Sequence, residues 1–175
     1  MTHHDQKSAE ALQKALQMEI EGKQFYSQSA DTSISQLARD LFQHLAAQED
    51  VHYQTVMEVY EAVKNKNEWP QKETVFNHPK SLKDVFTAAT EMMDVEANPA
   101  ASEMDAIKTA MSMEDKSYSF YKSRHEEATS AAEKQFYQAL TAEERKHYLT
   151  LVASYEYLSN PQGWFTMKEH WSLDG

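Results

Sequence analysis

The sequence predicts an all-α protein, a four-helix bundle built as two duplicated helical hairpins with a long crossover that contains a short helix. The 175 residues include only three Gly and four Pro, whereas β architectures need frequent turn residues. The stretch QMEIEGKQFY (17–26) returns 95 residues later as SMEDKSYSFY (112–121). A second stretch, LAAQEDVHYQT (45–55), returns with the same offset as LTAEERKHYLT (140–150). One offset that relates two separate segments indicates an internal duplication.

The first hairpin is expected at about residues 7–64. Its first helix, to about residue 30, has apolar residues along one broad face, as in an amphipathic helix. The polar cluster DTSIS (31–35) supplies residues suited to a turn and to a helix N-cap. A second helix then completes the hairpin.

The crossover is expected at about residues 65–98. Its first part, residues 65–79, is polar and contains two of the four prolines, which argues against a regular element. The segment 81–94 predicts a short helix, with Ser81 as its N-cap and Asp84 in its first turn.

The second hairpin is expected at about residues 99–159. Asn98 is the predicted N-cap of its first helix, and Pro99 is the first helical residue, a position that proline tolerates well. In the second helix of this hairpin, Glu133 is predicted to complete a capping box with Ser130.

The whole chain, residues 1–175, is interpreted as a single domain that ends in a tail at 160–175. Its formal net charge of −11 makes nucleic acid and anionic membranes poor partners. The absence of Cys excludes disulfides, thiolate zinc sites, iron–sulfur clusters and cysteine nucleophiles. The sequence also lacks a signal-peptide core and a run of about 18 apolar residues, so we expect a cytoplasmic protein.

Four glutamates of the duplicated hairpins fall at one level of the predicted bundle. Glu19 and Glu49 are 30 residues apart, and the midpoint between them lies in the first turn. Glu114 and Glu144 are also 30 residues apart, and their midpoint lies in the second turn. Residues equidistant from the turn of an antiparallel hairpin lie at the same height, which places all four glutamates roughly 20 Å from their turns.

A histidine follows the second glutamate of each hairpin, in the motifs Glu49-x-x-His52 and Glu144-x-x-His147. Residues spaced by three project from one helix face, so the carboxylate and the imidazole of each motif can bind one ion together. Four glutamates and two histidines on the bundle axis form the ligand set of di-metal carboxylate bundles.

Two divalent cations would balance the charge of four buried carboxylates, which otherwise repel one another strongly. Oxygen ligands with one imidazole per metal suit iron or manganese, and suit zinc less well. We expect one metal on Glu19 and His52, the other on Glu114 and His147, and Glu49 and Glu144 as bridges between them. Nearby acidic residues are predicted to point away from the metals: Glu21, Asp50, Asp115 and Glu143.

Two tyrosines, Tyr26 and Tyr121, each follow a site glutamate by seven residues, or about two helical turns. We assign them as hydrogen-bond donors that orient the ligating carboxylates during catalysis. Packing as ordinary core aromatics on the same helix face is the alternative.

The chain resembles the rubrerythrin branch of the ferritin-like superfamily over nearly its whole length. The matching features are Glu19-x6-Tyr26, Glu49-x-x-His52, Glu114-x6-Tyr121, Glu144-x-x-His147 and the closing segment YLSNPQGWF…HWSLDG (157–175). The resemblance implies a non-haem centre with two iron ions. It also implies peroxide reduction or ferrous oxidation as the usual activities.

The sequence departs from the family pattern at two points. Rubrerythrins commonly carry a rubredoxin domain with four Cys, and these 175 residues contain none. They also commonly carry an extra carboxylate three residues after the third-helix glutamate, where this chain has Ser117, with Gly22 at the duplicate position. The small residues either leave room for O2 or peroxide or only allow close packing of the helices.

The leading hypothesis is a di-iron oxidoreductase that reduces hydrogen peroxide or O2. Because a rubredoxin domain is missing, we expect a separate electron donor, such as a rubredoxin-like protein, and we expect a homodimer. The more symmetric set of six ligands favours the alternative of ferrous iron binding and oxidation. A dimanganese catalase-like enzyme is a further alternative, and zinc is a possible substitute metal.

Overall fold

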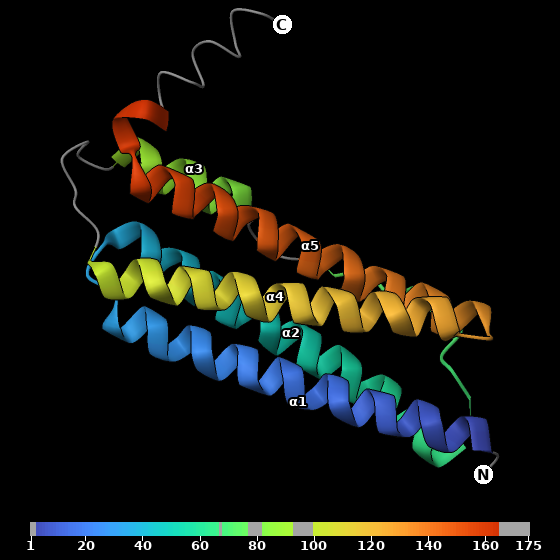
Figure 1. Ribbon diagram of the computed structural model, residues 1–175. Coiled ribbons are helices and arrows are strands. Elements are labelled where there is room, and N and C mark those ends of the chain that lie inside the picture. Colours follow the sequence, from blue (N-terminus) through green and yellow to red (C-terminus); the bar gives the residue numbers. More distant parts are fainter. Residues whose placement is uncertain (1–2, 67, 77–81, 93–99, 165–175) are drawn as a thin grey trace, which may run out of the picture.

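A computed structural model describes residues 3–66, 68–76, 82–92 and 100–164 (Figure 1). These residues form helices and no strand, which confirms the predicted fold class. The helices are α1 (His3–Thr32), α2 (Gln36–Lys66), α3 (Leu82–Met92), α4 (Ala101–Glu127) and α5 (Ala131–Ser159). None of the helices in the described part of the chain is long and apolar enough to cross a membrane.

The four long helices pair as two hairpins, α1 with α2 and α4 with α5 (Figure 1). The turn between α1 and α2 lies at the end of the bundle where α4 begins, and the α4–α5 turn lies where α1 begins. The hairpins are therefore related head to tail. Helix α3, within the crossover, packs on α2 and on α5.

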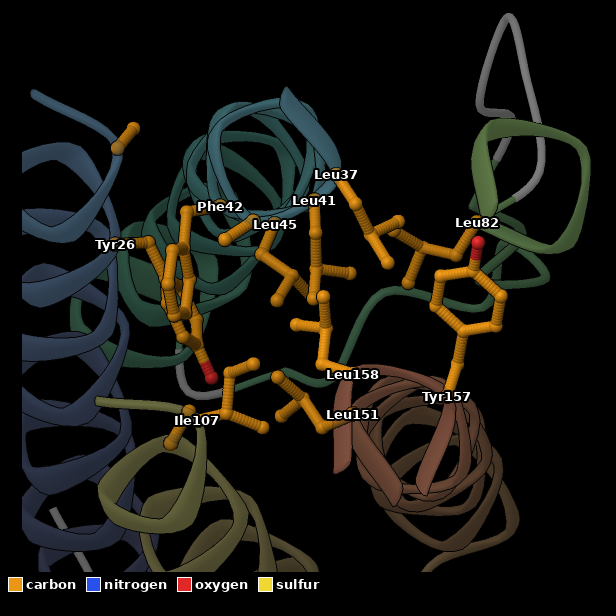
Figure 2. Close-up of a cluster of buried hydrophobic side chains, with 13 residues drawn as sticks. Tyr26, Leu37, Leu41, Phe42, Leu45, Leu82, Ile107, Leu151, Tyr157 and Leu158 are labelled. Atoms are coloured by element: carbon orange, nitrogen blue, oxygen red, sulfur yellow. The ribbon is translucent and has the colours of Figure 1, made fainter. Parts of the chain in front are cut away.

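Two apolar clusters occupy the two ends of the bundle. One contains the end of α1 and the start of α2, together with α3, the start of α4 and the end of α5. Figure 2 shows this cluster, in which Leu41 and Leu45 of α2 face Leu151 and Leu158 of α5. The other cluster is built around Tyr121 and Tyr137 and the opposite ends of the same long helices. The polar residues of the site lie at the level between the two apolar clusters.

Hydrogen bonds at the helix termini cap the helices and, through Glu103, connect the two hairpins. The hydroxyl of Ser35 accepts a hydrogen bond from the Ala38 N–H, and that of Ser130 accepts one from the Glu133 N–H, as expected for N-caps. The buried carboxylate of Glu103, in the first turn of α4, accepts three backbone N–H groups. These are Ile34 at 2.5 Å and Ser35 at 2.7 Å in the α1–α2 turn, and Ala100 at 3.1 Å.

Some predicted helix boundaries differ from those in the structure. Helix α4 begins at Ala101 with Ala100 as its N-cap, whereas the sequence predicted a cap at Asn98. The Glu103 carboxylate accepts the N–H of the N-cap residue Ala100, which is the half of a capping box that the third helical residue supplies. Asn98, Pro99, Ser81 and residues 165–175 of the predicted tail lie outside the described residues.

A short helical turn at 161–164 follows α5. Its Trp164 ring lies 5.7 Å from that of Phe86 in α3, and 6.4 Å from that of Tyr157 in α5. The beginning of the tail thus packs on the crossover helix at one end of the bundle.

Candidate metal centre

The six residues that the duplication singles out come together between the two apolar clusters. Each long helix contributes at least one of them. All six are buried, with exposed fractions between 0 and 3%: Glu19, Glu49, His52, Glu114, Glu144 and His147. The sequence alone therefore identified a set of side chains that the structure brings to one level of the bundle.

The six residues form two overlapping sets of four whose ligand atoms lie within 4.8 Å of one another, and a third set joins Glu49 to both histidines. One set is Glu19, Glu49, His52 and Glu144, and the other is Glu49, Glu114, Glu144 and His147. Glu49 and Glu144 belong to both sets, and these are the residues expected to bridge two metals. The geometry fits a di-metal site with one terminal carboxylate and one imidazole on each side.

The Nδ1 atoms of both histidines face the carboxylates. His52 Nδ1 lies 3.3 Å from Glu144 Oε1 and 3.4 Å from Glu19 Oε2. His147 Nδ1 lies 3.0 Å from Glu49 Oε1 and 3.3 Å from Glu114 Oε1. The two imidazole rings stack, with centroids 5.2 Å apart and planes within 9°. Nδ1 is therefore the atom that each histidine offers to a metal.

Several of these inward atoms have no well-directed hydrogen bond within the described part of the chain. They are Oε2 of Glu19, Oε1 of Glu49, Oε1 of Glu144 and Nδ1 of His147. Buried polar atoms without hydrogen bonds are costly, and they are exceptional in folded proteins. Cations at the cluster would satisfy them, so the residues present fit a di-metal group.

In the metal-free cluster, bound protons supply the positive charge that metal cations would otherwise supply. Burial, and next the negative charge of Glu49, raise the pKa of Glu19 to about 8. Burial and the neighbouring carboxylates also raise the pKa of Glu144 well above its usual value. Burial alone would raise the pKa of Glu49 too, but the protonated imidazoles of His147 and His52 beside it hold it well below its usual value.

Both histidines favour the protonated form in this environment. Burial alone would lower the pKa of a histidine, but the carboxylates around His147, Glu114 above all, raise its pKa to about 9. The pKa of His52 is raised well above its usual value by Glu144, Glu19 and Glu49 in spite of burial. The clustered carboxylates thus attract positive charge, and a divalent cation can replace these protons.

The two tyrosines connect the hairpins at the site. The Tyr26 hydroxyl donates to Glu114, and the Tyr121 hydroxyl donates to Glu19. Each phenol thus holds the terminal carboxylate of the other hairpin. Both phenols are buried, and burial together with the nearby carboxylates raises both pKa values well above the usual value, so they remain protonated donors.

Gly22 lies against a bridging carboxylate. A Cβ placed on Gly22 would lie 3.4 Å from both Cγ and Cδ of Glu49, at ordinary van der Waals contact. The small residue therefore gives room to the Glu49 side chain itself. Its duplicate Ser117 is only half-buried.

The sequence interpretation missed three residues around the cluster. The Nε2–H of His147 donates to Oε1 of buried Gln48 at 2.7 Å. The ring of Phe76, from the crossover, lies 4.7 Å from that of His52 and covers it. Glu143, which was predicted to point away from the metals, belongs to no ligand set and pairs with Lys146, but its burial was not foreseen. The 95-residue offset pairs Gln48 with Glu143, which was a signal available in the sequence.

Comparisons with known proteins agree with this architecture. The rubrerythrin family matches residues 10–155. Among solved structures, a hypothetical protein from Pyrococcus furiosus is similar, with a TM-score of 0.62 and 23% identity over 86% of this chain and 89% of that one. That likeness supports the fold alone, and no curated protein gave a significant match. Because the family match spans well over half of the sequence, the chain belongs to the rubrerythrin family.

Proposed function

We propose that this protein binds two iron ions at the buried cluster and reduces hydrogen peroxide or O2 with electrons from a separate donor. The observation that carries the proposal is the pair of overlapping ligand sets that share Glu49 and Glu144. Two adjacent metals with shared carboxylates can act on the two oxygens of one O–O bond together.

In this proposal, Glu19 and His52 would hold one iron, and Glu114 and His147 would hold the other. Glu49 and Glu144, which belong to both sets of four, would contribute to both. Hard carboxylate ligands with a single imidazole on each side suit iron, and manganese is the alternative. When bound in the reduced state, the two ions supply the pair of electrons that peroxide reduction requires.

The protein's own contribution is to hold the ligands and to exclude water. Tyr26 and Tyr121 orient the terminal carboxylates through their hydroxyl groups. The apolar clusters on either side of the cluster and the Phe76 ring over His52 keep the site away from bulk solvent. The low dielectric constant of this buried region strengthens the interactions between the charged groups within it.

The electron donor is proposed to be a separate protein, such as a rubredoxin-like protein, because these 175 residues contain no Cys to hold a rubredoxin iron. We further propose that the chain acts as a homodimer in the cytoplasm. Size-exclusion chromatography with light scattering tests the dimer directly.

Metal analysis of protein purified without oxygen tests the proposed function first. We expect two iron ions per chain, and rapid appearance of ferric absorbance when the nearly colourless ferrous protein is mixed with peroxide. Mixing the same protein with O2 separates the activities, since a peroxidase reacts faster with peroxide than with O2. A protein that binds neither iron nor manganese would contradict the proposal.

Ferrous iron binding and oxidation is the second candidate function. It is supported by the equal ligand sets of the two halves, which have no additional carboxylate at Gly22 or Ser117. Fast oxidation by O2, with release of ferric iron in place of turnover by a reductant, would favour this function. Bound manganese with peroxide disproportionation would instead favour a catalase-like enzyme.

A further inference from the structure

A chain of aromatic rings leads from the metal centre towards the surface of the bundle. The hydroxyl of Tyr121 donates to Glu19, one of the terminal carboxylates. The Tyr121 ring stacks on that of Tyr137 in α5, with centroids 6.2 Å apart and an angle of 24° between the planes. The Tyr137 ring lies 5.7 Å from the ring of Trp69 in the crossover. Both distances are typical of aromatic contacts, so the three rings form a continuous path.

The two ends of this path differ in exposure. Tyr121 and Tyr137 are buried completely, whereas Trp69 is partly exposed. A phenol or an indole gives up an electron far more readily than a phenyl ring, because its oxygen or nitrogen lone pair enriches the ring in electrons. The path therefore consists of the ring types suited to carry electrons between the surface and the centre.

The other half of the centre has a phenyl ring at the corresponding place. Tyr26 donates to Glu114, and its ring stacks on that of Phe42, with centroids 6.0 Å apart and an angle of 21° between the planes (Figure 2). Phe42 corresponds to Tyr137 through the offset of 95 residues. The stacking is thus shared by both halves, and the second phenol belongs to one half alone.

Packing does not explain the hydroxyl of Tyr137. This hydroxyl is buried and makes no hydrogen bond within the part of the chain that the structure describes. A buried hydroxyl without a partner costs stability, so stability alone favours phenylalanine at this position, as at Phe42. A role in electron transfer accounts for the phenol.

We propose that electrons from the external donor enter the protein at Trp69 and reach the metal centre through Tyr137 and Tyr121. This inference rests on the proposed function, since the oxidant that drives the transfer is the iron centre after its reaction with peroxide or O2. It identifies the route by which a separate donor reduces a centre that is buried on every side.

Electrons and protons balance at each step of this route. Tyr121 gives one electron to the oxidised centre, and its phenolic proton moves to the Glu19 carboxylate along the existing hydrogen bond. An electron from Trp69 then crosses the Tyr137 ring, whose own proton stays in place, and restores Tyr121 as the proton returns from Glu19. The Trp69 indole releases its N–H proton to water, and regains one electron from the donor and one proton from water.

A flash experiment tests the path without turnover. Trp164→Phe and Trp171→Phe leave Trp69 as the one indole of the sequence. A laser flash that indole absorbs and phenol does not, given with a soluble electron acceptor, removes one electron from Trp69. Transient absorption then follows the conversion of the indole radical into a phenoxyl radical. The full-length protein is measured both metal-free and loaded with Zn2+, which neither gives nor takes an electron here.

We expect the indole radical to decay as a phenoxyl radical forms on Tyr121. Tyr137→Phe should abolish most of this conversion without unfolding the protein, because the hydroxyl that it removes makes no hydrogen bond within the described residues. Tyr121→Phe should abolish it too, since Tyr137 has no acceptor for its proton. Tyr60→Phe alters another buried tyrosine of the same apolar cluster and should leave the conversion unchanged. Circular dichroism shows whether each variant keeps its helices.

The iron-loaded protein provides a second readout that does not depend on activity. With excess peroxide and no donor, the path should draw electrons from Trp69, and peptide mass spectrometry should detect oxygen added to its indole. Tyr137→Phe should reduce this modification. Trp164, the duplicate of Trp69, is also partly exposed, and its oxidation by bulk peroxide should be unaffected by Tyr137→Phe.

Conversion that persists in Tyr137→Phe or in Tyr121→Phe would overturn the inference. So would an indole radical that decays in the parent protein without a phenoxyl radical, or oxidation of Trp69 that does not depend on Tyr137. These results leave the proposed function intact, because they concern only the route of the electrons. Protein that binds neither iron nor manganese would contradict the proposed function itself, and the metal-free flash measurement would still decide whether the path exists.

Discussion

The protons held by the buried cluster predict how the stability of the metal-free protein depends on pH. The Glu19 carboxyl has a pKa of 4.5 when free of the fold, whereas burial and the charge of Glu49 raise it to about 8 in the folded protein. A group whose pKa is raised by folding stabilises the fold fully below its unfolded pKa, and this contribution is lost as the pH rises to the folded pKa. The metal-free protein should therefore lose stability between pH 4.5 and pH 8.

The size of the loss follows from the same values. At about 1.4 kcal/mol for each pH unit, the interval from 4.5 to 8 corresponds to about 5 kcal/mol for Glu19. The pKa of His147 is raised from 6.5 to about 9, mainly by Glu114 against the effect of burial, so the loss continues to about pH 9. A loss of this size is a large part of the roughly 5–15 kcal/mol that stabilises a typical domain.

Urea unfolding in the presence of a chelator measures this dependence through the loss of helical circular dichroism at about pH 5, 7 and 9. Glu19→Gln removes the carboxyl and should flatten the curve below about pH 8. Glu21→Gln, at an exposed position of the same helix, controls for the general loss of one negative charge. A metal-free protein that is equally stable or more stable at pH 8 than at pH 5 would refute the reasoning. Bound Co2+ should reverse the slope, because the cation competes with the protons.

Substitutions at four further positions test individual contacts, by urea unfolding of the metal-free protein except where metal binding is named. Tyr121→Phe removes a donor to a buried carboxylate and should cost about 2 kcal/mol, whereas Tyr137→Phe removes a hydroxyl that makes no hydrogen bond within the described residues and should cost little. Glu103→Ala leaves three backbone N–H groups without their acceptor and should cost roughly 3 kcal/mol; a change below about 0.5 kcal/mol would show that the hairpins do not depend on it. Gly22→Ala should stabilise α1 by about 0.5–1 kcal/mol through the higher helix propensity of Ala, since its methyl group meets Glu49 only at ordinary contact distance. Gly22→Leu should abolish two-metal binding, because a longer side chain at this position meets the Glu49 carboxylate. An unchanged metal stoichiometry in Gly22→Leu would contradict the close approach to Glu49.

The fold and the cluster were predictable from the sequence because both depend on spacing. The offset of 95 residues and the interval of 30 between glutamates determine the height of each side chain in an antiparallel hairpin. The i, i+3 spacing of each Glu-x-x-His motif then determines which face the two side chains share. These quantities require only regular helices, so they were available before any tertiary contact was known.

The parts that the sequence did not predict depend on contacts between elements that are far apart in the chain. Helix α4 is capped by Glu103, which also binds the distant α1–α2 turn, and local cap preferences at Asn98 carry no sign of that contact. Phe76 covers His52 from an irregular segment, where no periodicity indicates its direction. Glu143 is buried and pairs with Lys146, and its place next to Glu144 in the sequence carries no sign of that burial.

The comparison of the two halves separates what the centre requires from what can vary. The halves agree at the six cluster residues and at both tyrosine donors. An unmatched change there would leave a buried carboxylate without a cation or a donor, at a cost of several kcal/mol. The halves differ one step away from the cluster, where Gln48 hydrogen-bonds His147 while its duplicate Glu143 pairs with Lys146. A duplicated centre therefore keeps its inward-facing residues and their tyrosine donors identical, whereas a neighbour that finds another partner can change, since an amide and a carboxylate each satisfy their own hydrogen bonds.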